Sequence, residues 1–356
     1  MSGYRVGVLG ATGAVGSTIL RVLEQRAFPV GELVPFASAR SVGKPIELAG
    51  RNYRCVELGD DTIDGLDIVI SAAGGSISAE WAPRLVAGGA VVIDNTSYWR
   101  MHEGVPLVVA EVNPADAARH RGLIANPNCS TMQMVVALKP ILDAVGIERL
   151  VISTYQSVSG TGRRAIEELR AQSIALLEGG AEPTADVEVE ANVYPHRIAF
   201  NVLPQVESFA AGDDYTTEER KMMAETRKIF GLDADQLGIS ATCARVPVFG
   251  AHSESVNVQT TTPLSPEECR ALLASAPGVV VVDDPAASGY PLAFEATGRD
   301  EVLVGRIRRD PSHERCLNLW IVADNLRKGA ATNAVQIAEL LVARGLVSVP
   351  TPSLVA

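Results

Sequence analysis

Cys129 is the residue of the sequence whose surroundings most favour covalent chemistry. It follows the strand-like segment Leu123–Asn126 and Pro127, and apolar residues then recur at every third or fourth position. A helix is therefore expected to begin close to Cys129. The N–H groups and the positive end of a helix lower the pKa of a thiol, and they can also stabilise an oxyanion. Cys129 is thus a candidate catalytic nucleophile.

The other cysteines lack comparable surroundings. They are Cys55, Cys243, Cys269 and Cys316. Together with Cys129 they make an odd number at wide, irregular spacing and without a Cys-x-x-Cys pair, which fits neither a disulfide framework nor a zinc site. We therefore expect small buried thiols in a reducing compartment, and no metal site.

His252 is the histidine best placed to handle protons for a nucleophile. It lies in the segment Arg245–Glu254, at a turn between two strand-like segments, where a side chain can be aimed into a cleft. We expect His252 to act as a general acid/base. The remaining histidines lie in polar, charged or proline-adjacent stretches and are expected to be solvated; they are His102, His120, His196 and His313.

A glycine-rich turn near the start of the chain predicts a dinucleotide site. It follows the apolar segment Val6–Leu9 and opens a helical pattern. In that context glycine lets the backbone approach a pyrophosphate at a helix N-terminus. The spacing Gly-x-x-Gly-x-x-Gly departs from the commoner Gly-x-Gly-x-x-Gly, so the prediction depends on the strand, turn and helix together. The candidate cofactor-binding residues are Gly10, Thr12, Gly13, Ala14, Val15 and Gly16.

The residues after the second expected strand favour NADP over NAD. An acidic residue that would bind a ribose 2′-hydroxyl is missing there, and the sequence offers Ser38, Arg40 and Ser41 instead. A guanidinium flanked by hydroxyls suits a 2′-phosphate. An exposed loop arginine without a ligand is the alternative.

The elements that must position these residues follow two patterns. The first third alternates short apolar runs, such as Asp67–Ser71 and Val91–Asp94, with helical spacing, as in Ser78–Val86. This pattern predicts a parallel sheet with crossover helices. Beyond about residue 149, segments such as Arg149–Val158 and Glu254–Thr261 predict half-buried strands of a mixed sheet. Further expected strands are Leu33–Phe36, Val302–Ile307 and Leu317–Val322, with helices at Thr217–Ile229 and Gly329–Arg344.

The expected fold class is α/β: a Rossmann-type dinucleotide-binding domain plus an α+β catalytic and dimerisation domain with a mixed sheet. The last helix is expected to return to the nucleotide domain. That domain would then comprise residues 1–128 plus 329–356, and the second domain residues 129–328. The segment Gly179–Asp186, rich in small and polar residues, is expected to be a mobile surface loop.

Composition narrows the class of protein. The chain of 356 residues is 47% hydrophobic and 21% charged, which is typical of globular proteins. Its net charge of -11 opposes binding to nucleic acid or to an anionic membrane. No apolar run is long enough to span a membrane, and the start has no signal-peptide layout. We therefore expect a cytoplasmic protein that acts on a small molecule.

Taken together, six segments make the chain resemble aspartate-semialdehyde dehydrogenases over nearly its full length. Each would be weak alone, but their order and spacing are specific. The match is better than to glyceraldehyde-phosphate dehydrogenases, whose cysteine motif differs. The segments are Gly10–Gly16, Asn126–Thr131, Tyr155–Gly160, Glu218-x-x-Lys221, Arg245–His252 and Asp324–Ala330.

The resemblance implies a reaction and a role for each matching residue. NADPH would reduce β-aspartyl phosphate to aspartate semialdehyde with release of phosphate, a step in the synthesis of the aspartate family of amino acids, and the enzyme would be a homodimer. Cys129 would form a thioester, which His252 and Gln156 would assist. Arg245 would bind the carboxylate of the substrate, and Glu218 would bind its amino group. Arg100 and Lys221 would bind the phosphate, and Asn128 would also contact the substrate. Ser159, Gly160 and Asn325 would contact the cofactor.

Two other functions compete with this one. An N-acetyl-glutamyl-phosphate reductase would share the glycine turn, the cysteine and the histidine, but its acylated substrate amine has no need of Glu218. A non-catalytic nucleotide-binding or redox-sensing relative would be expected to lose Cys129, Gln156 or His252, and all three are present. Without the resemblance, Glu218 and Lys221 would be interpreted as a surface ion pair worth less than about 1 kcal/mol.

Overall fold

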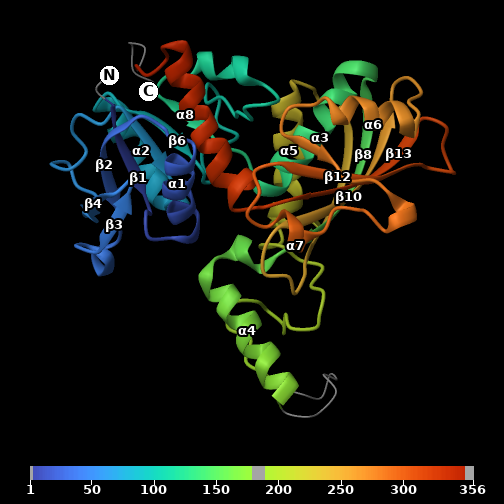
Figure 1. Cartoon of the computed structure of the whole chain (residues 1–356), viewed down its shortest axis with the longest axis horizontal. Helices are drawn as coiled ribbons and strands as arrows, with labels where there is room; N and C mark the ends of the chain where they lie inside the picture. Colours follow the sequence, from blue (N-terminus) through green and yellow to red (C-terminus); the bar gives the residue numbers. More distant parts are fainter. Residues whose placement is uncertain (1–2, 179–188, 349–356) are drawn as a thin grey trace. The chain divides into compact units, whose positions relative to one another are not determined.

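The computed structural model describes residues 3–178 and 189–348. The chain divides into two compact units (Figure 1). The first comprises Met1–Asn128, Lys228–Phe230 and Gly329–Ala356, and the second comprises Cys129–Arg227 and Gly231–Lys328. The expected mobile loop Gly179–Asp186 lies outside the described residues.

The first unit is built on a five-stranded parallel sheet of order β2-β1-β5-β6-β7. All residues of β5 and β6 are buried, which explains why these strands appear in the sequence as uninterrupted apolar runs. The strands are β1 (Tyr4–Leu9), β2 (Val30–Phe36), β5 (Ile68–Ser71), β6 (Val91–Asp94) and β7 (Leu123–Ala125). The helices are α1 (Ala14–Gln25), α2 (Gly75–Ala87), the 3-10 helices η1 (Ala39–Ser41) and η2 (Pro114–Arg119), and α8 (Asn333–Arg344).

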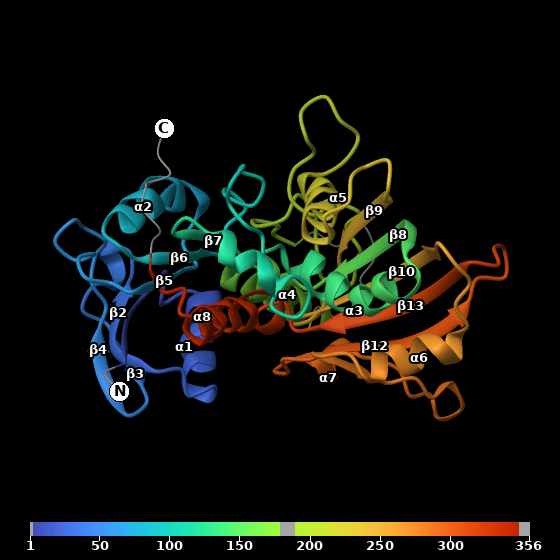
Figure 2. The ribbon, with the colours of Figure 1, turned by 90° about the horizontal axis from the view of Figure 1, so that it is seen from above.

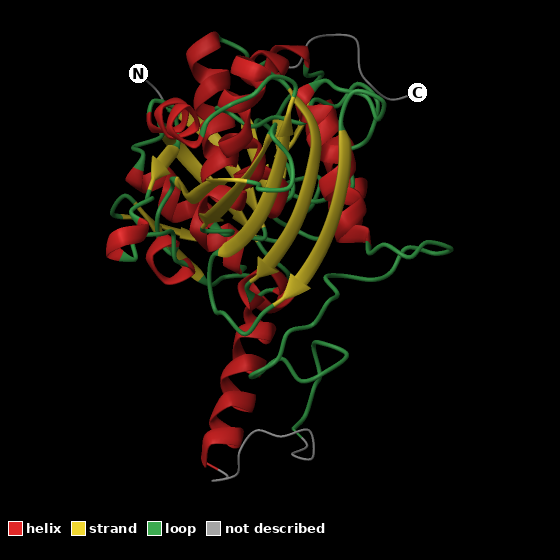
Figure 3. Cartoon of the chain, turned by 90° about the vertical axis from the view of Figure 1, so that its right-hand side faces the viewer, coloured by secondary structure: helices red, strands yellow, loops and turns green. Residues whose placement is uncertain are grey.

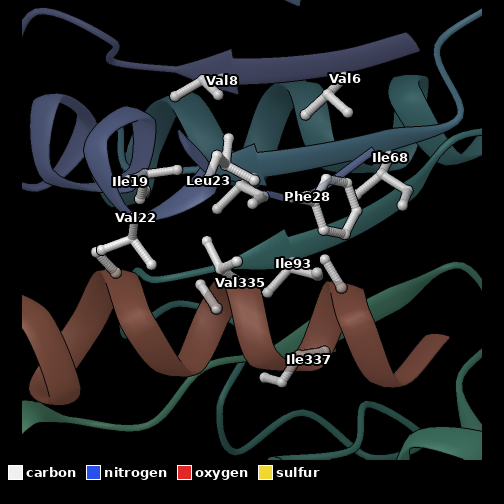
Figure 4. Packing of buried hydrophobic residues seen from close by; sticks show 14 of the residues in the cluster. Val6, Val8, Ile19, Val22, Leu23, Phe28, Ile68, Ile93, Val335 and Ile337 are labelled. Carbon is white, nitrogen blue, oxygen red and sulfur yellow. The ribbon is translucent and has the colours of Figure 1, made fainter. Parts of the chain in front are cut away.

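Helices cover both faces of this sheet. Figure 2 shows α2 on the face opposite to α1 and α8. The main core of the unit lies between α1, α8 and the strands, and Figure 4 shows Val22, Val335 and Ile93 among the side chains that fill it. The C-terminal helix thus completes the core that the first third of the chain begins.

The second unit is built on a six-stranded mixed sheet of order β11-β12-β13-β10-β8-β9. Pairs β8–β9 and β11–β12 are parallel, and the other three are antiparallel. The strands are β8 (Ile147–Gln156), β9 (Gly238–Arg245), β10 (His252–Thr260), β11 (Val279–Val281), β12 (Val302–Arg309) and β13 (Cys316–Ala323). The helices are α3 (Cys129–Val145), α4 (Arg163–Glu178), α5 (Thr217–Phe230), α6 (Pro266–Ala274) and α7 (Ala293–Ala296), with 3-10 turns η3 (Val158–Thr161) and η4 (Pro285–Ala287). The last residues of α5, Lys228–Phe230, are counted with the first unit.

Helix α3 packs on this sheet against β8, β10, β12 and β13. Along β10, His252, Glu254, Val256, Val258 and Thr260 are all buried, whereas the intervening side chains are mostly half-buried. This two-residue period places every second side chain of β10 on the same face of the sheet. Figure 3 shows the broad sheet, with α4 extending away from it.

The predicted fold class and the predicted strands are confirmed, apart from shifts of up to three residues at their ends. Three details differ. The expected last helix from Gly329 begins instead as a π-helix, Arg327–Thr332, which passes into α8 at Asn333. The hairpin β3 (Pro45–Leu48) and β4 (Arg51–Arg54) was not expected.

The third difference is that His120 is not solvated. It is 3% exposed; its Nε2 lies 3.1 Å from the carbonyl oxygen of Leu346, and its Nδ1 accepts from the N–H of Gly122 at 3.0 Å. Burial lowers the pKa of its imidazole. The packing of the C-terminal segment over η2, which a local sequence pattern does not reveal, explains the error.

Candidate active site

Cys129 is the first residue of α3 and is half-buried, whereas the other four cysteines are buried. A thiol at a helix N-terminus is favoured as the thiolate. Burial has the opposite effect elsewhere: it raises the pKa of Cys269 to about 12 and raises that of Cys243 further. Cys129 therefore begins a helix and is less buried than the other four thiols, as expected, and its role as the nucleophile stays a prediction.

Gln156 links the start of α3 to α5. It ends β8 and is 1% exposed. Its Nε2 donates to the hydroxyl of Ser130 and, at 2.9 Å, to Oε1 of Glu218. Glu218 is itself 3% exposed, and its Oε2 lies 3.2 Å from Nζ of Lys221. Glu218 and Lys221 therefore form a largely buried pair beside Gln156, and not the exposed ion pair that the spacing alone suggests.

His252 is the first residue of β10 and is 1% exposed, so it is packed more closely than a turn position suggested. The N–H of Ser157 donates to its Nδ1 at 3.0 Å. Its carbonyl oxygen accepts from Nε2 of Gln133, one turn beyond Cys129 on α3, at 3.3 Å. His252 is thus tied both to the end of β8 and to the helix that Cys129 begins.

Arg245 completes this group of side chains. It ends β9, pairs in register with Gln156 and is 6% exposed. Its Nη1 donates to the carbonyl oxygen of Ser157 at 2.7 Å. A Cβ atom at Gly160 would lie 3.2 Å from both Arg245 Nη1 and His252 Nε2, so any side chain larger than glycine would crowd both.

Electrostatics keep His252 neutral. Burial, reinforced by the positive charge of Arg245, lowers the pKa of the imidazole to about 3, and Glu218 opposes the shift. At neutral pH the imidazole therefore has one proton.

The structure places the predicted residues in two groups. The first unit contains the glycine turn, Ser38, Arg40, Ser41, Arg100 and Asn128. The second unit contains Cys129, Gln156, Ser159, Gly160, Glu218, Lys221, Arg245, His252 and Asn325. Arg100 is 7% exposed, and its guanidinium donates to the carbonyl oxygens of Asn126 at 3.0 Å and Asn95 at 2.9 Å.

The glycine turn has the geometry that a dinucleotide pyrophosphate needs. Gly10 has φ 75°, and a Cβ atom at Gly16 would lie 2.1 Å from the carbonyl oxygen of Gly10. Gly13 is the N-cap of α1, without a side-chain cap, and no acidic residue lies in the first turn. The first N–H groups of α1 can therefore bind an anion. Beyond β2, Ser38 and Arg40 are exposed and Ser41 is buried.

Other residues of the site were not predicted from the sequence: Ser130, Gln133, Ser157 and Glu254. The alternation along β10 could have revealed Glu254, because it shares the face of Val256 and Val258. Glu254 is fully buried, and neither carboxyl oxygen has a hydrogen-bond partner of normal geometry in the described part of the chain. Burial raises its pKa well above the ordinary range; Gln133 opposes and Glu218 reinforces the shift.

This buried carboxyl predicts how stability depends on pH. Because the folded pKa is raised, the folded chain keeps a proton that the unfolded chain loses above about pH 4.5, so this group destabilises the fold as pH rises. Glu254→Gln removes the titration. The variant should match the wild type near pH 4.5 and exceed its free energy of unfolding at higher pH, by up to about 1.4 kcal/mol per pH unit. Denaturant unfolding across pH measures this; the exposed Glu314→Gln is the control. A constant difference at every pH would contradict it.

Ala251, immediately before His252, is held in the left-handed region at φ 62° and is 1% exposed. It packs with Ala296, Leu303 and Val322. Ala251→Gly should leave the free energy of unfolding within about 1 kcal/mol, because relief of strain offsets the greater freedom of the unfolded chain. Ala251→Val should cost more than about 2 kcal/mol, since a β-branched residue tolerates neither this φ nor the lack of space. Thermal unfolding compares the two; equal losses would refute the account of strain.

Fold and site together define a semialdehyde dehydrogenase. Residues 5–120 match the family model described as the NAD binding domain of semialdehyde dehydrogenase, and residues 138–328 match that of its dimerisation domain. The aspartate-semialdehyde dehydrogenase of Aquifex aeolicus is 55% identical over 97% of this chain and its own whole length, and that of Legionella pneumophila is 51% identical over 98% of each. The chain belongs to the aspartate-semialdehyde dehydrogenase family.

Solved structures agree. Aspartate semialdehyde dehydrogenase II of Vibrio cholerae superposes with a TM-score of 0.90 at 48% identity, covering 96% of this chain and 99% of that one. A second structure of that enzyme, described as complexed with ASA, gives 0.91 at 47% identity, with the same coverage. Separately, none of the helices in the described ranges is long and apolar enough to cross a membrane.

Proposed function

We propose that the chain reduces β-aspartyl phosphate to aspartate semialdehyde with NADPH, releasing phosphate, through a thioester on Cys129. The observation that best supports this is the buried cluster around the start of α3. There Gln156 donates hydrogen bonds to Ser130 and Glu218. Gln133 of α3 donates a hydrogen bond to the backbone carbonyl oxygen of His252. Relatives that carry this activity in their names cover nearly the whole chain.

The thiol performs the first half of the reaction. The sulfur of Cys129 attacks the acyl carbon, the carbon–oxygen bond to the phosphate breaks, and phosphate leaves, so that a thioester remains. Splitting one difficult step into two is the advantage of covalent catalysis. Gln156 orients substrate and thiol, and His252 handles protons at the reacting atoms.

Complementary charges would select the substrate. An acyl phosphate with an α-carboxylate is anionic at both ends, and guanidinium binds such groups through two parallel hydrogen bonds. Arg245 would bind the carboxylate and Glu218 the amino group. Arg100 and Lys221 would bind the phosphate, and Asn128 would contact the same substrate.

The glycine turn and the segment that follows β2 would bind NADP. Thr12 in the turn and Ala14 and Val15 at the uncapped start of α1 would bind the pyrophosphate. Ser38, Arg40 and Ser41 would bind the 2′-phosphate. NADPH bound there would supply the hydride that reduces the thioester. Ser159, Gly160 and Asn325 would contact the nicotinamide side.

The preference for NADPH depends on Arg40. Its loss should raise the KM for NADPH and leave that for NADH nearly unchanged, because only NADPH has the 2′-phosphate. A single ionic hydrogen bond of about 1.5–3 kcal/mol corresponds to roughly 10- to 100-fold. Steady-state KM values for both cofactors with wild type and Arg40→Ala measure this. Equal KM values for NADH and NADPH in the wild type would overturn the assignment.

The two units divide the work in this proposal. Residues 1–128 with 329–356 bind NADP, and residues 129–328 carry the chemistry and form a homodimer. The matched dimerisation model over 138–328 supports the second role. Light scattering after size-exclusion chromatography measures the mass of the assembly, which should equal that of two chains. We also place the enzyme in the cytoplasm, where the buried thiols Cys55, Cys243, Cys269 and Cys316 would stay reduced.

The reverse assay tests the function. The purified chain, given aspartate semialdehyde, phosphate and NADP, should form NADPH, and Cys129→Ala should not. Formation without phosphate, or none at all, would refute the reaction. Faster turnover of N-acetyl-glutamate semialdehyde would favour the rival acyl-phosphate reductase, whose substrate has no amino charge for Glu218.

A further inference from the structure

Ser157 contacts both His252 and Arg245. It is fully buried. Its N–H donates to His252 Nδ1 at 3.0 Å, and its carbonyl oxygen accepts from Arg245 Nη1 at 2.7 Å. Its hydroxyl lies 3.1 Å from His252 Nδ1 and 3.2 Å from Oδ1 of Asn325. One residue thus fixes both side chains through three different groups.

The backbone contact determines the tautomer of the imidazole. A peptide N–H can only donate, so His252 Nδ1 must accept from it. A neutral imidazole has one proton, which must then be on Nε2. That atom is buried and has no hydrogen-bond partner among the described residues, and a Cβ atom at Gly160 would lie 3.2 Å from it. His252 therefore presents an N–H donor beside a glycine.

The hydroxyl groups nearby permit the same arrangement. Oγ of Ser159 donates to Oδ1 of Asn325 at 3.0 Å, and it lies 3.0 Å from Oγ of Ser157. The hydroxyl of Ser157 has one proton, which it can donate either to Oδ1 of Asn325 at 3.2 Å or to His252 Nδ1 at 3.1 Å. Because Oδ1 of Asn325 already accepts from Ser159, donation to Nδ1 leaves neither acceptor without a donor. The N–H and the hydroxyl of Ser157 then share the single lone pair of Nδ1, which disfavours a proton on that nitrogen.

We propose that Ser157 is a positioning residue that holds His252 in the Nε2–H tautomer, so that His252 donates a hydrogen bond to the substrate carbonyl oxygen as negative charge develops there. The proposal rests on the proposed function, and it narrows the acid/base role expected of His252. No proton leaves the imidazole in this step. A neutral, preorganised donor in a buried site stabilises charge without reorganisation.

The tautomer can be measured without any assay of activity. In the full chain labelled with 15N-histidine, long-range proton–nitrogen correlation spectra distinguish the two neutral tautomers from the imidazolium, and a His252→Asn spectrum identifies the signals of His252. We expect a neutral ring protonated at Nε2 at neutral pH. A ring protonated at Nδ1, or an imidazolium, would overturn the proposal even if the enzyme were fully active.

Variants test the part played by the hydroxyl. Ser157→Ala keeps the backbone N–H but loses one donor, and kcat should fall about fivefold, the size of one neutral hydrogen bond, with the substrate KM little changed. Its spectrum should show some Nδ1–H tautomer, whereas Ser255→Ala, a serine replacement on the same strand as His252, should retain the wild-type tautomer. An unchanged kcat and tautomer in Ser157→Ala would contradict the role of the hydroxyl. If the reverse assay failed while the tautomer was as expected, only the proposed function would be wrong.

Discussion

Replacement of Cys129 by serine is expected to lower kcat by about 10³-fold or more. The serine hydroxyl keeps the geometry at the start of α3, but its pKa is far too high for the helix N-terminus to ionise it at neutral pH. The reaction would then lose its nucleophile while substrate binding persisted. Steady-state kinetics in the reverse direction measure kcat and the substrate KM.

Cys316→Ala is the matched control for this change. Cys316 is 6% exposed at the start of β13, and burial raises the pKa of its thiol. Its loss should leave kcat unchanged even if stability falls slightly. A Cys129→Ser variant that retained activity within about tenfold of the wild type would exclude the thioester mechanism.

Replacement of His252 by asparagine should have the second-largest effect, a fall in kcat of about 10²- to 10⁴-fold. Asparagine can still accept from the N–H of Ser157 through Oδ1, but it has no group that reaches the position of Nε2. Glutamine extends an amide donor toward that position. His252→Gln should therefore retain more activity than His252→Asn, and kcat with KM for both variants measures the difference.

Thermal unfolding is the control here, because His252 is 1% exposed and either change perturbs a packed site. The kcat values of the two variants can be compared if their thermal unfolding midpoints are similar. Glutamine no better than asparagine would argue against donation from Nε2. Asparagine with nearly wild-type kcat would remove His252 from the chemistry.

Local pattern was sufficient for the parts of the site that depend on neighbours in sequence. Residue spacing predicts the strand, turn and helix around Gly10–Gly16 and the helix that begins at Cys129. The N–H groups at these helix starts belong to residues that are adjacent in sequence, so a short segment is enough to predict them. The mixed sheet was predictable for the same reason: strands such as β10 alternate buried and half-buried side chains.

The contacts around His252 were not predictable in that way. Its hydrogen bonds join residues 95 and 119 positions apart, Ser157 on one side and Gln133 on the other. These contacts depend on the register of β8, β9 and β10 and on the packing of α3. No single segment of the sequence specifies that register or packing. The burial of Glu218 and His120 has the same origin.

The hairpin β3–β4 was missed for a different reason. Its turn is Ala49-Gly50, with φ of 49° and 73°, and alanine rarely adopts that conformation. The usual hairpin signal is Asn-Gly or Asp-Gly. A turn that depends on a strained residue lacks the sequence signal on which the prediction relies.

The thioester on Cys129 is the central claim, and mass spectrometry of the enzyme mixed with β-aspartyl phosphate, without NADPH, tests it most directly. The account predicts that the intact chain gains the mass of one aspartyl group, that peptide analysis locates it on Cys129, and that Cys129→Ser gains nothing. An aspartyl group on another residue, or an active enzyme that never acquires one, would contradict it.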